Sequence, residues 1–226
     1  MKLLSVNTGR ATFSEHTDAE GGLTGIGKRP VEGPVRVFRP GPKGVGGSGV
    51  AGDDVCDKRH HGGDHQAVYA YAREDLDSWE RELGRELPGG AFGENLTTSG
   101  LDVGDARIGE RWRIGPDVVL EVSRARIPCR TFAGALDEQG WVKRFTRAGA
   151  PGAYLRVVEE GEIRAGDAIE VVHRPAHEVS VAFWFRAFTT ERELLPRTLA
   201  AGEAMPREDH ETVRKHLERQ AARRAS

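Results

Sequence analysis

The chain has 226 residues, with 33 Lys and Arg against 35 Asp and Glu, so its formal net charge is −2. Dedicated nucleic-acid-binding proteins usually carry a strong basic excess, which this chain lacks. No apolar run approaches the ~18–20 residues of a membrane span, and the first residues turn polar too soon for a signal peptide. Two cysteines are too few for a fold stabilised by a framework of disulfide bonds. We therefore expect a soluble cytoplasmic protein with no nucleic-acid or membrane partner.

Short Val-rich runs bounded by Gly, Pro or Asp recur through the first three quarters of the chain, which is typical of β-strands. With 29 glycines available for turns, they predict a mainly β fold with helical additions, such as a barrel or sandwich. The expected strands are Leu3–Val6, Val35–Phe38, Ala67–Tyr71, Arg111–Ile114, Val118–Val122, Ala153–Val158 and Ala168–Val172. Two helices are expected between them, Ala72–Leu83 and Leu136–Arg147, because apolar side chains recur on one face of each.

The composition changes after Pro175, where strand patterns stop and helix signals dominate. Three helices are expected there, at Val179–Phe188, after the capping-box pattern Thr190-Glu191-Arg192-Glu193, and at Glu208–Arg224. Pro196 is expected to shorten or kink the second helix. We divide the chain into a body, residues 1–175, and a small helical segment, residues 176–226, that packs on the body or on another subunit. The aromatic residues of its first helix suggest a homodimer contact.

The segment richest in glycine is Gly41–Gly52. Its stretch Gly44-Val45-Gly46-Gly47-Ser48-Gly49 formally matches G-x-G-x-x-G. This motif binds a pyrophosphate where a helix opens at the last glycine, and the residues that follow open none. No Gly-Lys-Ser/Thr follows either, which excludes a P-loop. We interpret the segment as a flexible surface loop.

A second glycine-containing segment, Lys58–Ala67, carries two cations, three histidines and a carboxylate between two strand-like runs. Glycines allow close approach of the backbone to a ligand, and adjacent N–H groups can bind an anion. His60 and His61 can donate hydrogen bonds, transfer protons or bind metal. The alternative is a polar turn whose histidines are merely exposed. We favour a functional loop, since functional residues concentrate on such segments.

A cysteine among arginines follows the expected strand Val118–Val122, in Arg124-Ala125-Arg126-Ile127-Pro128-Cys129-Arg130. Because nearby cations favour the thiolate, Cys129 is expected to ionise more readily than a free thiol. A thiolate serves as a nucleophile or as a soft metal ligand, and inert burial is the alternative. We interpret Cys56, within another strand-like run, as a small core residue.

A zinc site formed by Cys56, His60, His61 and Cys129 would have suitable ligand types. No C-x2-C or H-x3-H pair supports it, so we do not favour it. Glu94 and Asn95, and likewise Lys28 and Arg29, lie on expected turns. Taken alone, these are ordinary turn residues. Taken together, the cations and histidines would suit an anionic, phosphate-bearing cofactor whose metal accepts the Cys129 thiolate.

Four motifs occur in one order along the chain: Gly25–Val31, His60-His61-Gly62-Gly63, Phe92–Thr97 and Arg126-Ile127-Pro128-Cys129. In this order they resemble the MOSC domain, the molybdenum-cofactor sulfurase C-terminal domain. Gly161–Asp167 is similar to the closing hairpin of that domain. The residues after Pro175 resemble the three-helix segment of stand-alone bacterial MOSC proteins of the YiiM type.

The resemblance implies a MOSC-type β-barrel with a positively charged cleft that holds a molybdopterin-type cofactor. Cys129 matches the family cysteine that ligates molybdenum, with His60 and His61 as further catalytic candidates. The residues that the resemblance assigns to cofactor binding are Lys28, Arg29, His60, His61, Gly62, Gly63, Asn95, Arg126 and Cys129. The chain departs from the family pattern at Asp64-His65-Gln66, and at Ala125 where a proline is common.

The activity that the resemblance implies is molybdenum-dependent reduction of N-hydroxylated compounds such as hydroxylaminopurines, hydroxylamines and amidoximes. N–OH becomes N–H and water, with His60 or His61 as a proton source. The sequence contains no ferredoxin cysteine pattern and no convincing dinucleotide fingerprint, so electrons are expected from a separate partner protein. Two alternatives stay open. The chain could carry the cofactor without chemistry of its own, or transfer sulfur as a Cys129 persulfide.

Overall fold

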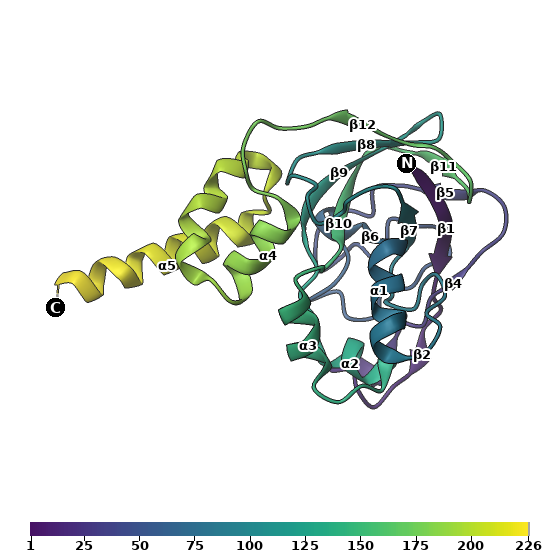
Figure 1. Ribbon diagram of the computed structural model, residues 1–226, viewed down its shortest axis with the longest axis horizontal. Helices are drawn as coiled ribbons and strands as arrows, with labels where there is room; N and C mark the ends of the chain where they lie inside the picture. The colour runs from purple at the N-terminus through teal and green to yellow at the C-terminus, as the bar shows by residue number, and fades with distance from the viewer. Residues whose placement is uncertain (226) are drawn as a thin grey trace.

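The computed structural model describes residues 1–225, which form a curved sheet with helices at two of its sides (Figure 1). The strands are β1 (Lys2–Thr8), β2 (Thr12–Phe13), β3 (Leu23–Thr24), β4 (Arg29–Pro30), β5 (Val35–Val37), β6 (Val68–Ala72), β7 (Leu96–Ser99), β8 (Arg111–Ile114), β9 (Val118–Ala125), β10 (Ala153–Glu159), β11 (Gly161–Ile163) and β12 (Ile169–His173). The α-helices are α1 (Arg73–Leu83), α2 (Arg130–Leu136), α3 (Trp141–Ala148), α4 (Val181–Thr189) and α5 (Arg207–Ala225). The 3-10 segments are η1 (Glu20–Gly22), η2 (Asp64–Gln66) and η3 (Arg192–Ala204).

Eight strands form one sheet in the order β12-β8-β9-β10-β6-β7-β1-β4. All neighbours are antiparallel except β6 and β7, which are parallel and are joined through α1. Two small ladders, β11-β5 and β2-β3, lie outside this sheet. Each expected strand run of the body coincides with a strand, with shifts of a few residues at its ends. The Val-rich runs therefore predicted the strands correctly.

The expected barrel is not formed as a closed ladder. β12 and β1 approach each other, where Leu3 N donates to Asp167 O at 2.9 Å and Ile169 N donates to Met1 O at 3.0 Å. This contact is an isolated bridge between Lys2 and Ala168, and the strands do not continue it as a ladder. Helices take up about 32% of the chain and strands about 25%. The fold is thus mixed α/β with one large sheet, rather than mainly β.

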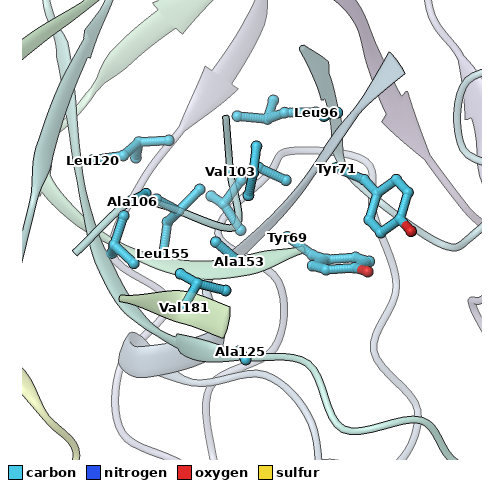
Figure 2. Close-up of a cluster of buried hydrophobic side chains, with 14 of the residues drawn as sticks. Tyr69, Tyr71, Leu96, Val103, Ala106, Leu120, Ala125, Ala153, Leu155 and Val181 are labelled. Atoms are coloured by element: carbon cyan, nitrogen blue, oxygen red, sulfur yellow. The ribbon is translucent and has the colours of Figure 1, made fainter. Parts of the chain in front are cut away.

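The hydrophobic core is continuous from the sheet into the first tail helix. Figure 2 shows Tyr69 and Tyr71 of β6, Leu120 of β9 and Leu155 of β10 in one buried cluster, with Val181 of α4 beside them. Burying large apolar side chains is the main favourable term in folding. The composition shift after Pro175 follows the end of β12, but the tail residues that come next contribute to the core of the body.

One expected body helix is divided in two. The pattern Leu136–Arg147 predicts a single helix, whereas the structure ends α2 at Leu136 and begins α3 at Trp141. Asp137 adopts the left-handed conformation at φ 52°, and its N–H bonds the Gly134 carbonyl to end α2. Aspartate tolerates this conformation better than most residues, which explains the break. By contrast, α1 matches its expectation and ends at Gly84 in the left-handed region.

The tail differs from its expectation in the middle helix. The capping-box pattern at Thr190–Glu193 does not cap a helix, because Glu191 is the N-cap of η3 and makes no side-chain capping bond. η3 is a 3-10 segment that contains Pro196 and is kinked at Gly202. The aromatic residues of α4 are also used within the chain. Phe183, Trp184 and Phe185 are buried, so they give no support to a dimer contact.

Candidate functional site

A cleft of about 440 Å³ lies where the β2–β3 hairpin, the glycine-rich loop, the histidine loop and the turn from β9 into α2 meet. It brings together most of the candidate site residues: Lys28, His60, His61, Gly62, Asn95, Arg126 and Cys129. These residues come from segments far apart in the sequence, and they meet at the C-terminal end of β9. Arg29 and Gly63 do not line the cleft.

Cys129 lies at the start of α2 as its N-cap residue, half-buried in the cleft wall. Burial alone would raise the pKa of its thiol. A hydrogen bond with the His61 side chain and the positive charge of Arg126 outweigh burial and lower that pKa to about 6. The thiol is therefore largely ionised at neutral pH, which makes it a nucleophile or a soft metal ligand.

Arg126 is a buried cation of the cleft whose charge acts on the Cys129 thiol. Its side chain is buried, donates to the Phe92 carbonyl, and lies over the Phe132 ring at 3.8 Å and the Tyr69 ring at 5.1 Å. Its Nε is buried without a hydrogen-bond partner. Among the lysines and arginines lining the cleft within residues 1–225, only Arg126 has no carboxylate within ion-pair distance.

Lys28, expected as a second phosphate-binding cation, is already paired. It forms a buried ion pair with Asp53, whose side chain is only 1% exposed. Asp53 also accepts from Asn95 Nδ2 at 2.8 Å and from the Gly9 amide at 2.8 Å. Burial lowers the pKa of Lys28 in spite of the Asp53 charge. Lys28, Asp53 and Asn95 therefore form a neutralised cluster in the cleft wall.

The Phe92–Thr97 turn is built around Glu94 rather than around a ligand. The buried Glu94 carboxylate accepts from the Gly90 amide at 2.6 Å, the Phe92 amide at 3.0 Å and the Thr97 hydroxyl at 2.9 Å. Asn95 follows with both ends of its side chain in use, because its Oδ1 accepts from Tyr69 N at 3.1 Å. Within this motif, Glu94 and Asn95 shape the cleft wall through bonds to the chain itself.

The two histidines of the candidate site differ in exposure. His60 is exposed at the edge of the cleft, whereas His61 is half-buried and bonds Cys129. The amides of both residues donate to the Asp57 carbonyl, at 3.3 and 2.9 Å, which folds the loop into a turn. His61 thus contacts the thiol, whereas His60 is exposed to solvent.

The glycines of the histidine loop pack against the glycine-rich loop. A Cβ on Gly62, at φ 75°, would meet the Gly47 carbonyl at 2.7 Å, and one on Gly63, at φ 76°, would meet the Lys43 backbone at 2.7 Å. Asp64 reinforces the contact, since its carboxylate accepts from Gly41 N at 3.0 Å. The glycine-rich loop is therefore not a free surface loop, although no helix follows it, as expected.

Two expectations need correction. Arg29 is exposed on β4, where it pairs with Thr8 of β1, outside the cleft. Cys56 is not a core residue of a strand. It lies half-buried in the loop before the histidines and lines the cleft, and burial raises the pKa of its thiol.

Residues 1–225 contain no group of three His, Cys, Asp or Glu side chains placed to hold a metal ion. The four-ligand zinc site is therefore not formed.

Some residues that line the cleft were not among the site residues expected from the sequence. Asp53 is one, and no local pattern identifies it because its partner Lys28 is 25 residues away. Arg124 and Tyr154 also line the cleft, and burial raises the pKa of the Tyr154 hydroxyl. Arg124 had a usable signal, since it precedes Arg126 by two positions in an extended segment and such side chains share a face.

Comparison with known proteins gives the family. Residues 57–170, which include the histidine loop, the Glu94 turn and Cys129, match the MOSC domain family. The chain belongs to the MOSC family. It is 35% identical over 181 residues to the uncharacterized protein YflK of Bacillus subtilis, covering 80% of this chain and 77% of YflK. The crystal structure of YiiM from Geobacillus stearothermophilus superposes with a TM-score of 0.76 at 29% identity, covering 96% of this chain and 98% of YiiM.

A fungal relative is longer. The protein named reductase from Gibberella moniliformis is 35% identical over 144 residues, which are 62% of this MOSC chain but only 26% of the reductase. The chain thus spans about a quarter of that relative. The likeness to YiiM extends over the helical tail as well as the sheet, so the tail is part of a YiiM-like architecture. No helix within residues 1–225 has the length and apolar character required to cross a membrane.

Proposed function

We propose that this MOSC protein binds a molybdenum cofactor of the pterin type in the cleft and reduces N-hydroxylated compounds. The observation that carries the proposal is the pairing of an ionised Cys129 thiol with the buried Arg126 guanidinium, which has no carboxylate partner among the described residues. The MOSC family and the relative named reductase support an oxidoreductase. Cofactor identity and substrate class come from the family resemblance.

The residues present fit such a group. Thiolates are preferred ligands of soft metals, and Cys129 offers one to the cleft. Arg126 presents a buried Nε without a partner, suited to a phosphate or pterin oxygen. The absence of a cluster of three protein ligands in residues 1–225 is compatible with a metal that an organic cofactor already holds. Cys129 and Arg126 would hold the cofactor, which would supply the redox chemistry.

The side chains of the protein would supply protons and hold the ligand in its orientation. Reduction of N–OH to N–H and water consumes two electrons and two protons. His61 keeps the Cys129 thiol ionised through its hydrogen bond, so the sulfur is ready to bind metal at neutral pH. His60, exposed at the cleft edge, is suited to transfer protons from solvent. Lys28, Asp53 and Asn95 would act indirectly, by keeping the wall rigid behind the ligand.

The electrons would come from a separate donor protein. The chain has two cysteines, and both are unbridged and in the cleft region. Two cysteines cannot ligate an iron–sulfur cluster of the four-cysteine type. The glycine-rich loop opens no helix that would bind the pyrophosphate of a nicotinamide or flavin dinucleotide. We therefore assign the electron supply to a partner.

The test is to purify the protein from a host that makes molybdenum cofactor, beside Cys129→Ser. Molybdenum and pterin would be measured together, followed by turnover of an amidoxime with a chemical reductant. Near-stoichiometric molybdenum and pterin, both lost in Cys129→Ser, with turnover in the parent protein, is the expected result. Tight retention without turnover by any reductant would contradict the reductase and favour a carrier. A labile persulfide on Cys129, with neither molybdenum nor pterin, would favour sulfur transfer.

A further inference from the structure

A carboxylate of the tail forms ion pairs with two cations that line the cleft. Glu208, in the first turn of α5, accepts from Lys43 Nζ at 3.0 and 2.9 Å and forms an ion pair with a terminal nitrogen of Arg124. Lys43 and Arg124 both line the cleft, whereas Glu208 does not. An anionic group from outside the cleft thus neutralises cations that face into it.

The two acidic residues that begin α5 are bound differently. Asp209 is 3% exposed and accepts from the other terminal nitrogen of Arg124 at 3.0 Å. Glu208 is 42% exposed, and its partner Lys43 is 37% exposed. Exposed ion pairs contribute little to stability, whereas breaking a buried pair is costly. Asp209 is therefore the anchor of the tail, and Glu208 is the group that another anion can displace.

Both cations have contacts other than those with Glu208. Arg124 is fixed by Asp209 and lies 5.1 Å over the Trp184 ring. The Lys43 backbone packs on Gly63, and the amide of the next residue donates to the Lys58 carbonyl at 3.2 Å. After Glu208 leaves, the Arg124 side chain and the Lys43 backbone would therefore stay in place, with the Lys43 ammonium within reach of the same site.

We propose that Lys43 and Arg124 form a second anion-binding site of the cleft, for a phosphate group of its ligand, and that Glu208 fills this site in the ligand-free protein. It lies beside the Arg126 site, since Arg124 at the end of β9 and Arg126 just after it both line the cleft. The proposal deepens the proposed function, because it adds a second oxyanion position to the same cleft. The first experiment uses cofactor-free protein, so a failure of this proposal can be distinguished from a failure of the proposed function.

The experiment is calorimetric titration of inorganic phosphate, at low ionic strength, into cofactor-free protein. Glu208→Gln removes the competing charge and keeps the Asp209 anchor. We expect it to gain a phosphate-binding event about tenfold tighter than at the same site in the parent protein, from charge-assisted hydrogen bonds. Lys43→Ala combined with Glu208→Gln should lose that event. Glu211→Gln is the matched control, since Glu211 is half-exposed on the same helix and pairs with Arg207 instead.

An unchanged phosphate affinity in Glu208→Gln would overturn the proposal. An equal gain of phosphate affinity in Glu211→Gln would also overturn it, because that would show a general effect of charge. So would a gain in Glu208→Gln that persists when Lys43→Ala is added. Cofactor content then identifies the source of the phosphate. Loss of pterin from Lys43→Ala assigns the site to a phosphate of the cofactor. Retained pterin, together with phosphate binding in Glu208→Gln, assigns it to a phosphate of the substrate.

Discussion

Lys28 and Asp53 form an ion pair that is buried in the cleft wall, with side chains 8% and 1% exposed. A lysine in a turn next to an arginine suggested a free cation for phosphate. The structure instead uses it to neutralise a carboxylate that also fixes Asn95 and the Gly9 amide. In the functions proposed above, anion binding in the cleft therefore depends on Arg126, and on Lys43 and Arg124 at the second site.

Asp53→Asn tests the structural role of this pair. It leaves the Lys28 ammonium buried without a compensating charge, and breaking a buried pair from one side costs about 3–5 kcal/mol. We expect a loss of that size in the free energy of unfolding, measured by urea denaturation. Asp54→Asn is the control, because Asp54 is 41% exposed and its pair with Arg10 is 3.9 Å long. Equal effects in the two variants would contradict the buried pair.

The ionisation of Cys129 can be measured by alkylation with iodoacetamide across pH. The rate should rise with pH and have its midpoint at about 6, because the thiolate is the reactive form. Since the pKa is lowered in the folded protein, the stability linked to it is complete above the pKa of the unfolded thiol and is lost as pH falls through about 6. Mass spectrometry would separate Cys129 from Cys56, whose raised pKa predicts slower reaction at neutral pH.

His61→Ala should move that midpoint upward, because the thiolate loses a hydrogen bond that stabilises it. The control is His60→Ala, which removes the exposed neighbour from the same loop. A midpoint that shifts equally in both variants would mean that the loop, and not the His61 contact, sets the reactivity of Cys129.

The sequence identified the chemistry of single residues better than their pairing. Cys129 could be singled out because arginines and a proline surround it locally. The ion pair of Arg124 with Glu208 joins residues 84 positions apart, and no local pattern indicates it. The break between α2 and α3 likewise depends on two left-handed residues, Asp137 and Gly140. Strand runs were predictable because Val-rich alternation is local, whereas closure of the sheet depends on its long-range curvature.

Arg126→Lys should weaken cofactor retention although it preserves the charge. Lysine cannot lie flat over Phe132, reach the Phe92 carbonyl with one nitrogen and present another to an oxyanion. We expect a several-fold lower content of pterin and molybdenum after purification, with the fold retained by circular dichroism. Arg113→Lys, on the exposed side of β8, should leave both contents unchanged. An unchanged content in Arg126→Lys would remove Arg126 from the proposed binding site.

Trp184→Ala tests whether the helical segment after residue 175 is an independent unit. Trp184 is fully buried, stacks on Phe188 at 4.1 Å and lies against Arg124, which belongs to both the cleft and the tail anchor. Truncating a buried tryptophan costs about 3–5 kcal/mol. We expect that loss in a single urea transition of the whole chain, because the core is continuous from the sheet into α4.

Leu217→Ala, at a position 38% exposed on α5, is the matched truncation and should cost no more than about 0.5 kcal/mol. Two separate transitions, with Trp184→Ala shifting only one of them, would show that the helical segment unfolds on its own. In that case the Arg124–Asp209 ion pair would join two independently stable parts.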